Sequence, residues 1–318
     1  RNAAWHVSDI LTEINIDQDR REGFSDAFSI QTPVAENKIY LGTNDEASKE
    51  IKKISKVFGA GLVGITKYDS RWEYSKKFSD ISLKSYPPEI PENLKNVIVV
   101  ALPMDYDLVK TVPSALSGSA TGIGYSHDAL TVLSITQFIR NLGFEAIGSM
   151  NDTSLAIPYA IKAGLGEYGR NGLLITQKYG PRVRLGKIYT SLDLSHDEPI
   201  NFGVKEFCNI CNICATECPV KAIPFDPPSD NTYNQSNISG VRKWSVDGEK
   251  CFSFWTAQNS DCSICIRVCP YNKDYSKWIN RIIMKLANSW LRNLLIWLEV
   301  KLGNGKRIKS SQWWSSKK

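Results

Sequence analysis

Eight cysteines in two blocks are the residues best suited to chemistry in this 318-residue chain, and all lie between Cys208 and Cys269. The first block has the pattern Cys-x-x-Cys-x-x-Cys-x-x-x-Cys-Pro. The second ends in Cys-x-x-Cys-x-x-x-Cys-Pro and has a lone cysteine upstream. Thiolates are soft ligands, and the two-residue spacing lets three sulfurs converge on one cubane from a single loop. The pattern predicts two [4Fe–4S] clusters.

In two-cluster ferredoxins the fourth cysteine of each block binds the other cluster. We therefore expect one cluster on Cys208, Cys211, Cys214 and Cys269. The second is expected on Cys218, Cys251, Cys262 and Cys265. Cys251 departs from the usual spacing, because residues 252–261 separate it from the next ligand. The alternatives are a zinc ribbon, which lacks the third cysteine and the Cys-Pro ending, and disulfides, which usually tie distant parts of a small domain together.

Two clusters in one segment imply electron transfer. A non-catalytic electron carrier is one interpretation, but it leaves about 200 upstream residues without a role. A dinucleotide site is disfavoured. Gly164, Gly166 and Gly169 match the GxGxxG spacing, but a helical segment precedes them and a strand follows, which reverses the order that the motif needs. The three histidines are too scattered for a zinc site.

Four stretches upstream of the cysteines carry a family resemblance. In order they are Gly122-Ile-Gly-Tyr125-Ser-His127, Asn151-Asp-Thr, residues 163–176 (AGLGEYGRNGLLIT) and residues 179–186 (YGPRVRLG). With the two ferredoxin blocks they resemble the corrinoid-dependent respiratory reductive dehalogenases over roughly residues 55–275. Epoxyqueuosine reductases, which modify tRNA, share this layout. They have an aspartate where this chain has Tyr125, and a helical-repeat C-terminus that this chain lacks.

The resemblance implies a base-off cobalamin (corrinoid) with its cobalt facing a pocket for a small organohalide. Two one-electron steps would reduce Co(II) to Co(I), and a proton would replace the departing halide. Tyr125 would be the proton donor, and Asn151 would orient its phenol. A phenol with a pKa of about 10 is a poor acid at neutral pH, so a nearby cation must stabilise the phenolate. Arg184 is the expected cation, with Arg182 or Arg170 as substitutes.

The resemblance also suggests which residues bind the cofactor: Gly122, Gly124, His127, Gly164, Gly166, Gly169, Arg170, Asn171, Gly172 and Arg182. The glycines would permit close backbone approach to a bulky ligand, although tight turns alone would explain them. Tyr125 could simply begin a helix after a glycine-rich loop, and Asn151 could cap a turn. Arg182 and Arg184 alternate along a strand and would share a face.

Around these residues, strands and helices alternate. Helices are expected from Asn44, over His127–Leu142 and near Leu155–Ala163. Strands are expected at Leu62–Thr66, Val97–Leu102, Ala146–Met150, Leu173–Thr176 and Val183–Leu192. The predicted fold class is an α/β (α+β), nitroreductase-like, corrinoid-binding core followed by a ferredoxin-like two-cluster module. The expected units are an N-terminal segment 1–54 covering the core, the core 55–204, the cluster module 205–275 and a C-terminal tail 276–318.

Charge separates the tail from the body. The whole chain carries +6, but residues 273–318 hold 11 Lys and Arg against 2 Asp and Glu, which leaves the rest at −3. This distribution disfavours a nucleic-acid partner. Residues 279–298 have apolar side chains at helical spacing, typical either of a basic membrane-surface helix or of a helix packed on the domain. No stretch is long enough to span a bilayer.

The resemblance further implies export in the folded state and a location on the outer face of the cytoplasmic membrane. A small membrane-anchor protein would hold the enzyme there, with a homodimer left open. The chain begins with Arg1, and no signal peptide is visible. Among substrates, chlorinated alkanes and alkenes are favoured over aromatic compounds.

Overall fold

The computed structural model describes residues 33–78, 83–87, 90–151, 153–303 and 305–315, together with Ala3 and Val7. Most of the expected N-terminal covering segment therefore lies outside the described residues. The first long element is α3 (Asn44–Val57). Thr43 and Glu46 form a capping box at its start, which satisfies main-chain N–H groups that the first turn leaves unpaired.

A four-stranded antiparallel sheet forms the centre of the core, with strand order β1-β4-β8-β5. The strands are β1 (Leu62–Lys67), β4 (Asn96–Pro103), β8 (Val183–Thr190) and β5 (Ala146–Ser149). Side chains alternate along β4: Ile98 and Val100 pack on one face, Val97 and Val99 on the other. Both faces of the sheet are therefore buried.

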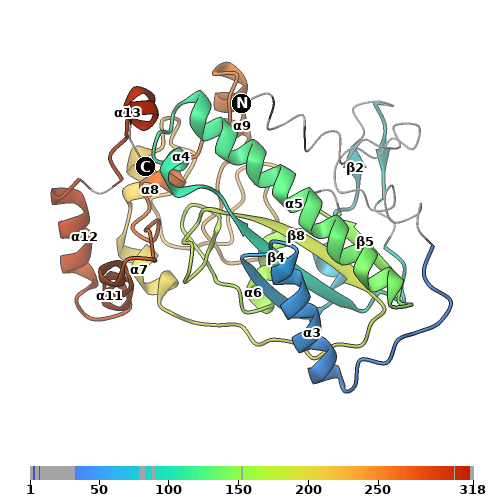
Figure 1. Cartoon of the computed structure of the whole chain (residues 1–318). Helices are drawn as coiled ribbons and strands as arrows, with labels where there is room; N and C mark the ends of the chain where they lie inside the picture. The colour runs from blue at the N-terminus through green and yellow to red at the C-terminus, as the bar shows by residue number, and fades with distance from the viewer. Residues whose placement is uncertain are drawn as a thin grey trace.

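Helices cover the two faces and give three layers (Figure 1). Helices α3 and α5 (Ala115–Asn141) pack on one face, and α6 (Ala156–Lys162) packs on the other. Short elements complete the core: η2 (Ser70–Trp72), β2 (Lys77–Phe78), β3 (Ser85–Tyr86), α4 (Tyr106–Val109), β6 (Glu167–Tyr168) and β7 (Leu174–Ile175). The expected α/β core is present.

The long helix α5 starts well before the expected His127. Ser114 caps it with Ser117, and it continues through Gly118, Gly122 and Gly124. The alternative that Tyr125 begins a helix after a glycine-rich loop is wrong, because these glycines lie buried inside α5. A Cβ on Gly124 would lie 3.0 Å from Cγ of Arg184. Glycine at this position lets α5 approach β8 closely, and Tyr125 lies inside the helix.

The cysteine module consists of short helices joined by loops: α7 (Val204–Ile210), α8 (Ile213–Glu217), α9 (Gly248–Ala257) and α10 (Ile264–Arg267). Three helices follow it: α11 (Trp278–Ala287), α12 (Arg292–Lys301) and α13 (Ser310–Ser315). The single amphipathic pattern of the tail thus folds as two helices that break between Ala287 and Arg292. Ala287 and Leu295 are buried against Phe207 of the module, while several tryptophans stay exposed.

Candidate active site and cluster module

Tyr125 meets the two partners that the sequence proposed for it. Its hydroxyl oxygen accepts a hydrogen bond of 2.8 Å from Nδ2 of Asn151, which follows β5. The guanidinium of Arg184 lies over its ring, with Cζ 3.8 Å from the ring centroid. The three side chains come from α5, from the end of β5 and from β8, so the fold brings together residues that are far apart in sequence.

A hydrogen-bond donor and a cation thus lie on two sides of the phenol. A cation over the ring is attracted by its π-electrons, and a negative phenolate strengthens that attraction. The amide of Asn151 donates to the phenol oxygen, so this oxygen is the acceptor of that hydrogen bond. Nε of Arg184 is buried without a hydrogen-bond partner. A negative charge on the phenol oxygen would therefore be stabilised by two groups that are already in place.

The cysteines fall into two neighbouring groups. Cys269 lies close enough to Cys208, Cys211 and Cys214 for their negative charges to raise its pKa. Cys251 and Cys262 are close to Cys218, and Cys265 is close to all three. These are the two sets expected from the spacing, including the exchanged fourth cysteine of each block. Cys265 also neighbours Cys214, so the two sets adjoin.

Burial shapes the chemistry of these thiols. Burial first, and neighbouring thiols second, raise the pKa of Cys208 and of Cys214 to about 12. A thiol binds metal only after it loses its proton. Iron ions would therefore have to displace the protons of these thiols when they bind. Cys218 Sγ also accepts a 3.3 Å hydrogen bond from the main-chain N–H of Ala222. Among the described residues, no group of three or more Cys, His, Asp or Glu is placed to hold a single metal ion. The eight cysteines are the kind of ligand that binds iron–sulfur clusters.

Residues 207–273 match the family described as 4Fe-4S dicluster domain. A tetrachloroethene reductive dehalogenase of Desulfitobacterium hafniense is 40% identical over 271 aligned residues, covering 73% of this chain and 49% of that relative. A solved reductive dehalogenase, whose structure suggests a mechanism for B12-dependent dehalogenation, is 26% identical. It superposes with a TM-score of 0.75 over 86% of this chain and 39% of its own.

The chain belongs to the reductive dehalogenase family. An epoxyqueuosine reductase of Lactococcus garvieae is 30% identical over 142 residues, covering 39% of this chain and 34% of that protein. The family expected from the sequence, its relation to epoxyqueuosine reductases and the dicluster domain are thereby confirmed. The chain spans about half the length of the dehalogenase relative that it matches.

The two arginines that could have replaced Arg184 as the cation beside Tyr125 have other partners in this reductive dehalogenase core. Arg170 is 2% exposed, and its donors bind main-chain carbonyls of the module at Cys208, Asn209, Pro224, Phe225 and Asp226. Arg182 donates to the carbonyls of Met104 and Lys273 and stacks between Tyr106 and Tyr179. Arg170 joins the core to the module, and Arg184 is the arginine on Tyr125.

A side chain on any glycine of the segment 164–172 would run into neighbouring protein atoms. A Cβ on Gly164 would lie 2.6 Å from the carbonyl oxygen of Glu198, and one on Gly166 would lie 2.2 Å from that of Ile175. Gly169 and Gly172 face Ile175 and Val246 in the same way. The expectation that these glycines admit a bulky ligand does not fit this packing. Turn geometry and close chain packing explain them, since Gly164 and Gly172 have φ near +70°.

The other residues expected at the cofactor are spread over two places. Gly122 and Gly124 are buried in α5, whereas His127 is exposed on the same helix. Asn171 is buried in the turn before β7, where its Oδ1 accepts a 3.2 Å hydrogen bond from the N–H of Leu173. Only the α5 group borders Tyr125. The fit to a corrinoid thus rests on the Tyr125 side of the core, where the phenol of Tyr125 and the guanidinium of Arg184 lie together.

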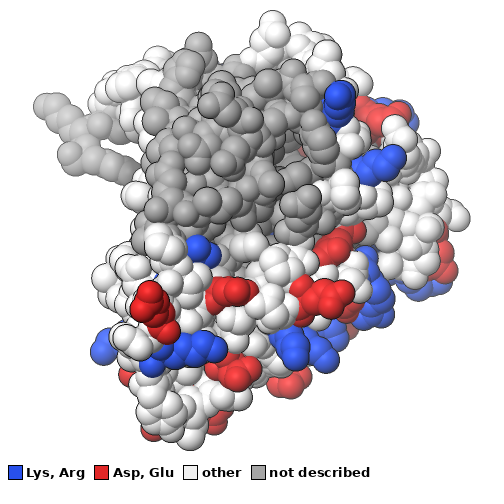
Figure 2. Space-filling view, turned by 90° about the vertical axis from the view of Figure 1, so that its right-hand side faces the viewer, with Lys and Arg blue, Asp and Glu red and all other residues white. Residues whose placement is uncertain are grey.

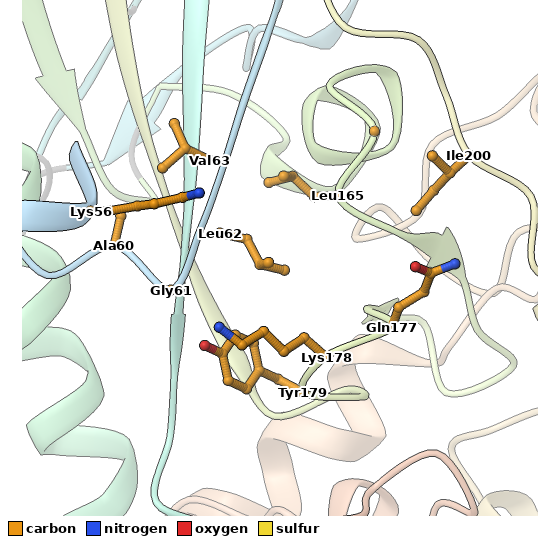
Figure 3. Close-up of a pocket in the computed structure, with 11 residues that line it drawn as sticks. Lys56, Ala60, Gly61, Leu62, Val63, Leu165, Gln177, Lys178, Tyr179 and Ile200 are labelled. Atoms are coloured by element: carbon orange, nitrogen blue, oxygen red, sulfur yellow. The ribbon is translucent and has the colours of Figure 1, made fainter. Parts of the chain in front are cut away.

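A cavity of about 610 Å³ lies at the start of β1 (Figure 3). Lys56, Lys178 and Tyr179 line it together with Gly164 and Leu165. None of Tyr125, Asn151 and Arg184 lines it. This cavity is therefore separate from the candidate proton donor.

Two buried charges beside the site had no signal in the sequence. Asp128 is 1% exposed on α5, and a Cβ on Gly186 of β8 would lie 2.4 Å from its Oδ1. Burial raises the pKa of Asp128 to about 7, and the positive charges of Arg184 and Lys187 oppose that rise. Lys187 of β8 is fully buried. Sequence patterns could not identify either residue, because α5 and β8 bury them only once the two are packed together.

Proposed function

We propose that this chain forms the catalytic core of a corrinoid-dependent reductive dehalogenase, with Tyr125 as the proton donor. The hydrogen bond from Asn151 to Tyr125, beneath the guanidinium of Arg184, is the observation that carries the proposal. A reduced corrinoid, when bound, would supply the electrons that break the carbon–halogen bond. The residues of this chain would supply the proton and the path for electrons.

The proton step follows from the contacts around the phenol. Asn151 fixes the phenol oxygen from one side and directs its proton away from the amide. When the proton leaves, the phenolate gains charge between a hydrogen-bond donor and a cation that stays in place throughout. Such preorganised groups lower the free energy of the charged state without further rearrangement. Arg184 and Asn151 would therefore act on the proton transfer rather than on substrate capture.

Electrons would reach the core through the dicluster domain. The ligand sets we propose are Cys208, Cys211, Cys214 and Cys269 for one cluster and Cys218, Cys251, Cys262 and Cys265 for the other. Cys214 and Cys265 are neighbours, so the two clusters would lie side by side. Arg170 ties the core to the carbonyl of Cys208, the first ligand. These hydrogen bonds would hold the loop that binds the first cluster against the core.

Replacement of Tyr125 by Phe in the anaerobically purified holoprotein tests the proposal. We expect halide release with reduced viologen as electron donor to fall at least about 100-fold, the usual cost of losing a general acid. Iron, cobalt and the visible spectrum should not change. Tyr179→Phe is the matched control, because this tyrosine also lies beside an arginine, with Arg182 Cζ 5.7 Å from its ring centroid. Unchanged turnover in Tyr125→Phe, or iron without cobalt in the wild type, would contradict the proposal.

We propose small chlorinated alkenes and alkanes as substrates, in line with the tetrachloroethene reductive dehalogenase to which the chain is similar. The test is a panel of chlorinated methanes, ethanes, ethenes and phenols with one enzyme preparation. Turnover confined to the phenols would refute this assignment.

The C-terminal helices support a location at a membrane surface, held there together with a small anchor protein. Trp278 in α11, Trp290 between α11 and α12, and Trp314 in α13 are 70%, 85% and 71% exposed. The same C-terminal segment is rich in lysine and arginine. By contrast, the face shown in Figure 2 intermixes both signs of charge in its described part. No described helix is long and apolar enough to cross a bilayer. The double variant Trp278→Ser/Trp290→Ser should bind more weakly than wild type to vesicles that contain anionic lipid. Trp72→Ser, in the core, is the control and should bind as wild type does. Equal binding by both variants would refute the role of the tail.

A further inference from the structure

The loop that carries Asn151 is held from the side of the sheet opposite Tyr125. Along β8, Arg184 and Gly186 face α5, as their contacts with Gly124 and Asp128 show. Strand alternation places Lys187 and Tyr189 on the other face, where Tyr189 packs in the cluster under α6. One strand thus presents the cation to Tyr125 on one face and two buried polar side chains on the other.

Lys187 reaches the main chain next to Asn151. It pairs with Ser149 across β5 and β8, and its Nζ donates a hydrogen bond to the carbonyl of Met150. The side chain of Lys187 is fully buried. Burying an ammonium group is costly unless it is well paired, and a surface lysine would incur no such cost. We therefore ascribe a role to the hydrogen bond from Lys187 to the carbonyl of Met150, which an apolar side chain could not form.

Tyr189 holds the other side of the same loop. Its hydroxyl exchanges hydrogen bonds with the hydroxyls of Thr153 and Ser154, and the Thr153 hydroxyl also pairs with that of Ser149. All four side chains are at most 1% exposed. The loop between Ser149 and Ser154 is thus fixed at both ends by one buried network, and Asn151 projects from the middle of it.

We propose that Lys187 and Tyr189 are positioning residues that fix the loop after β5 so that the amide of Asn151 meets the hydroxyl of Tyr125. This rests on the proposed role of Tyr125. Neither residue contacts the phenol, and both act through Asn151. A loss of either should leave the sheet intact and let the loop move, since the strand register is set by main-chain pairing of β8 with β4 and β5.

Amide hydrogen exchange tests the clamp without any assay of activity. In the holoprotein, Lys187→Met should raise exchange at least about tenfold in peptides covering residues 149–155 and leave the cysteine module unchanged. Lys162→Met is the control, because Lys162 is exposed on α6, which covers the same face of the sheet. Unchanged exchange in the loop of Lys187→Met would overturn the clamp. If that variant does not fold, Tyr189→Phe, which removes one oxygen, decides the question by the same measurement.

A double-mutant cycle tests whether the clamp acts through Asn151. Lys187→Met should lower kcat about tenfold with little change in KM, as expected for a misplaced catalytic group. In an Asn151→Ala background the same change should cost less than about twofold, because the amide to be positioned is gone. An equal loss in both backgrounds would show a merely structural role and overturn the proposal. If the wild type releases no halide, the proposed function fails, and the exchange experiment still decides the clamp.

Discussion

The cysteine module and the Tyr125 site differ in how their residues come together. Seven of the eight cysteines lie in two short blocks, so a few tight turns suffice to gather each set. Tyr125, Asn151 and Arg184 lie on a helix, a loop and a strand of different parts of the core, and only the packed sheet joins them. The cysteines of the module are gathered by local turns and by the iron they are proposed to bind. The residues of the Tyr125 site are gathered by the packing of helices on the sheet.

This difference predicts how each region fails. A missing thiolate should remove one cluster outright, because a cubane needs its fourth ligand and the surrounding helices are too short to hold the fold alone. A change near Tyr125 should leave the core folded and alter the rate of proton transfer, because many buried apolar residues hold the sheet and helices together. Substitutions in the two regions should therefore separate metal content from turnover.

The largest effect is expected for Cys265→Ser. It should remove about half of the iron and abolish turnover, since the second cluster loses one proposed ligand and electrons no longer reach the core. Iron analysis and electron paramagnetic resonance of the reduced protein measure the loss. Ser263→Ala, at the buried residue that precedes α10, should keep all of the iron. Full iron content in Cys265→Ser would remove this residue from the ligand set.

Arg184→Met comes next and tests the other region. We expect kcat to fall about 100-fold, because the phenolate of Tyr125 loses the cation over its ring. Iron content should stay unchanged. Arg184→Lys should recover part of the rate, since it keeps the charge but not the planar contact. Arg182→Met is the control on the adjoining stretch, with its guanidinium on the carbonyls of Met104 and Lys273. Equal rate losses in both methionine variants would contradict a specific role for Arg184.

Arg170→Met tests the junction between the two regions. The guanidinium donates to main-chain carbonyls of two segments of the module, 208–209 and 224–226, and its loss leaves these carbonyls without that partner. We expect the free energy of unfolding to fall by about 2 kcal/mol and cluster loss in air to become faster. Urea unfolding and the decay of the visible spectrum measure both. A variant as stable as wild type would show that the junction does not depend on Arg170.

The features that the sequence alone predicted are those that depend on residues close together in the chain. The cysteine blocks predicted the dicluster domain, and the family resemblance was carried by these blocks together with the four stretches that contain Tyr125, Asn151 and Arg184. The start of α5 was missed because glycines usually end helices, whereas here Gly124 lies inside the helix and lets it approach β8 closely. The roles of Arg170 and Lys187 could not be predicted, because they bind main-chain carbonyls of segments far away in sequence. Hydrogen bonds to the main chain leave no pattern in the partner's sequence.

Asp128 gives the smallest and most pH-dependent effect. Burial raises its pKa to about 7 in the folded chain, against an ordinary value of 3.8, and Oδ1 has no hydrogen-bond partner. Between these values the unfolded chain loses the proton while the folded chain keeps it, so stability falls as the pH rises toward 7 and stays lowered above it.

Asp128→Asn cannot ionise and should escape this loss. We expect its melting temperature to exceed that of wild type by about 2 °C near pH 8, and the difference to shrink near pH 5. Asp193→Asn, an exposed carboxyl just after β8, should show no such dependence. A shift of equal size at both pH values would mean that Asp128 is ionised throughout. In that case Arg184 would share its charge with Asp128, and its hold on the Tyr125 phenolate would be weaker than the geometry of the ring contact indicates.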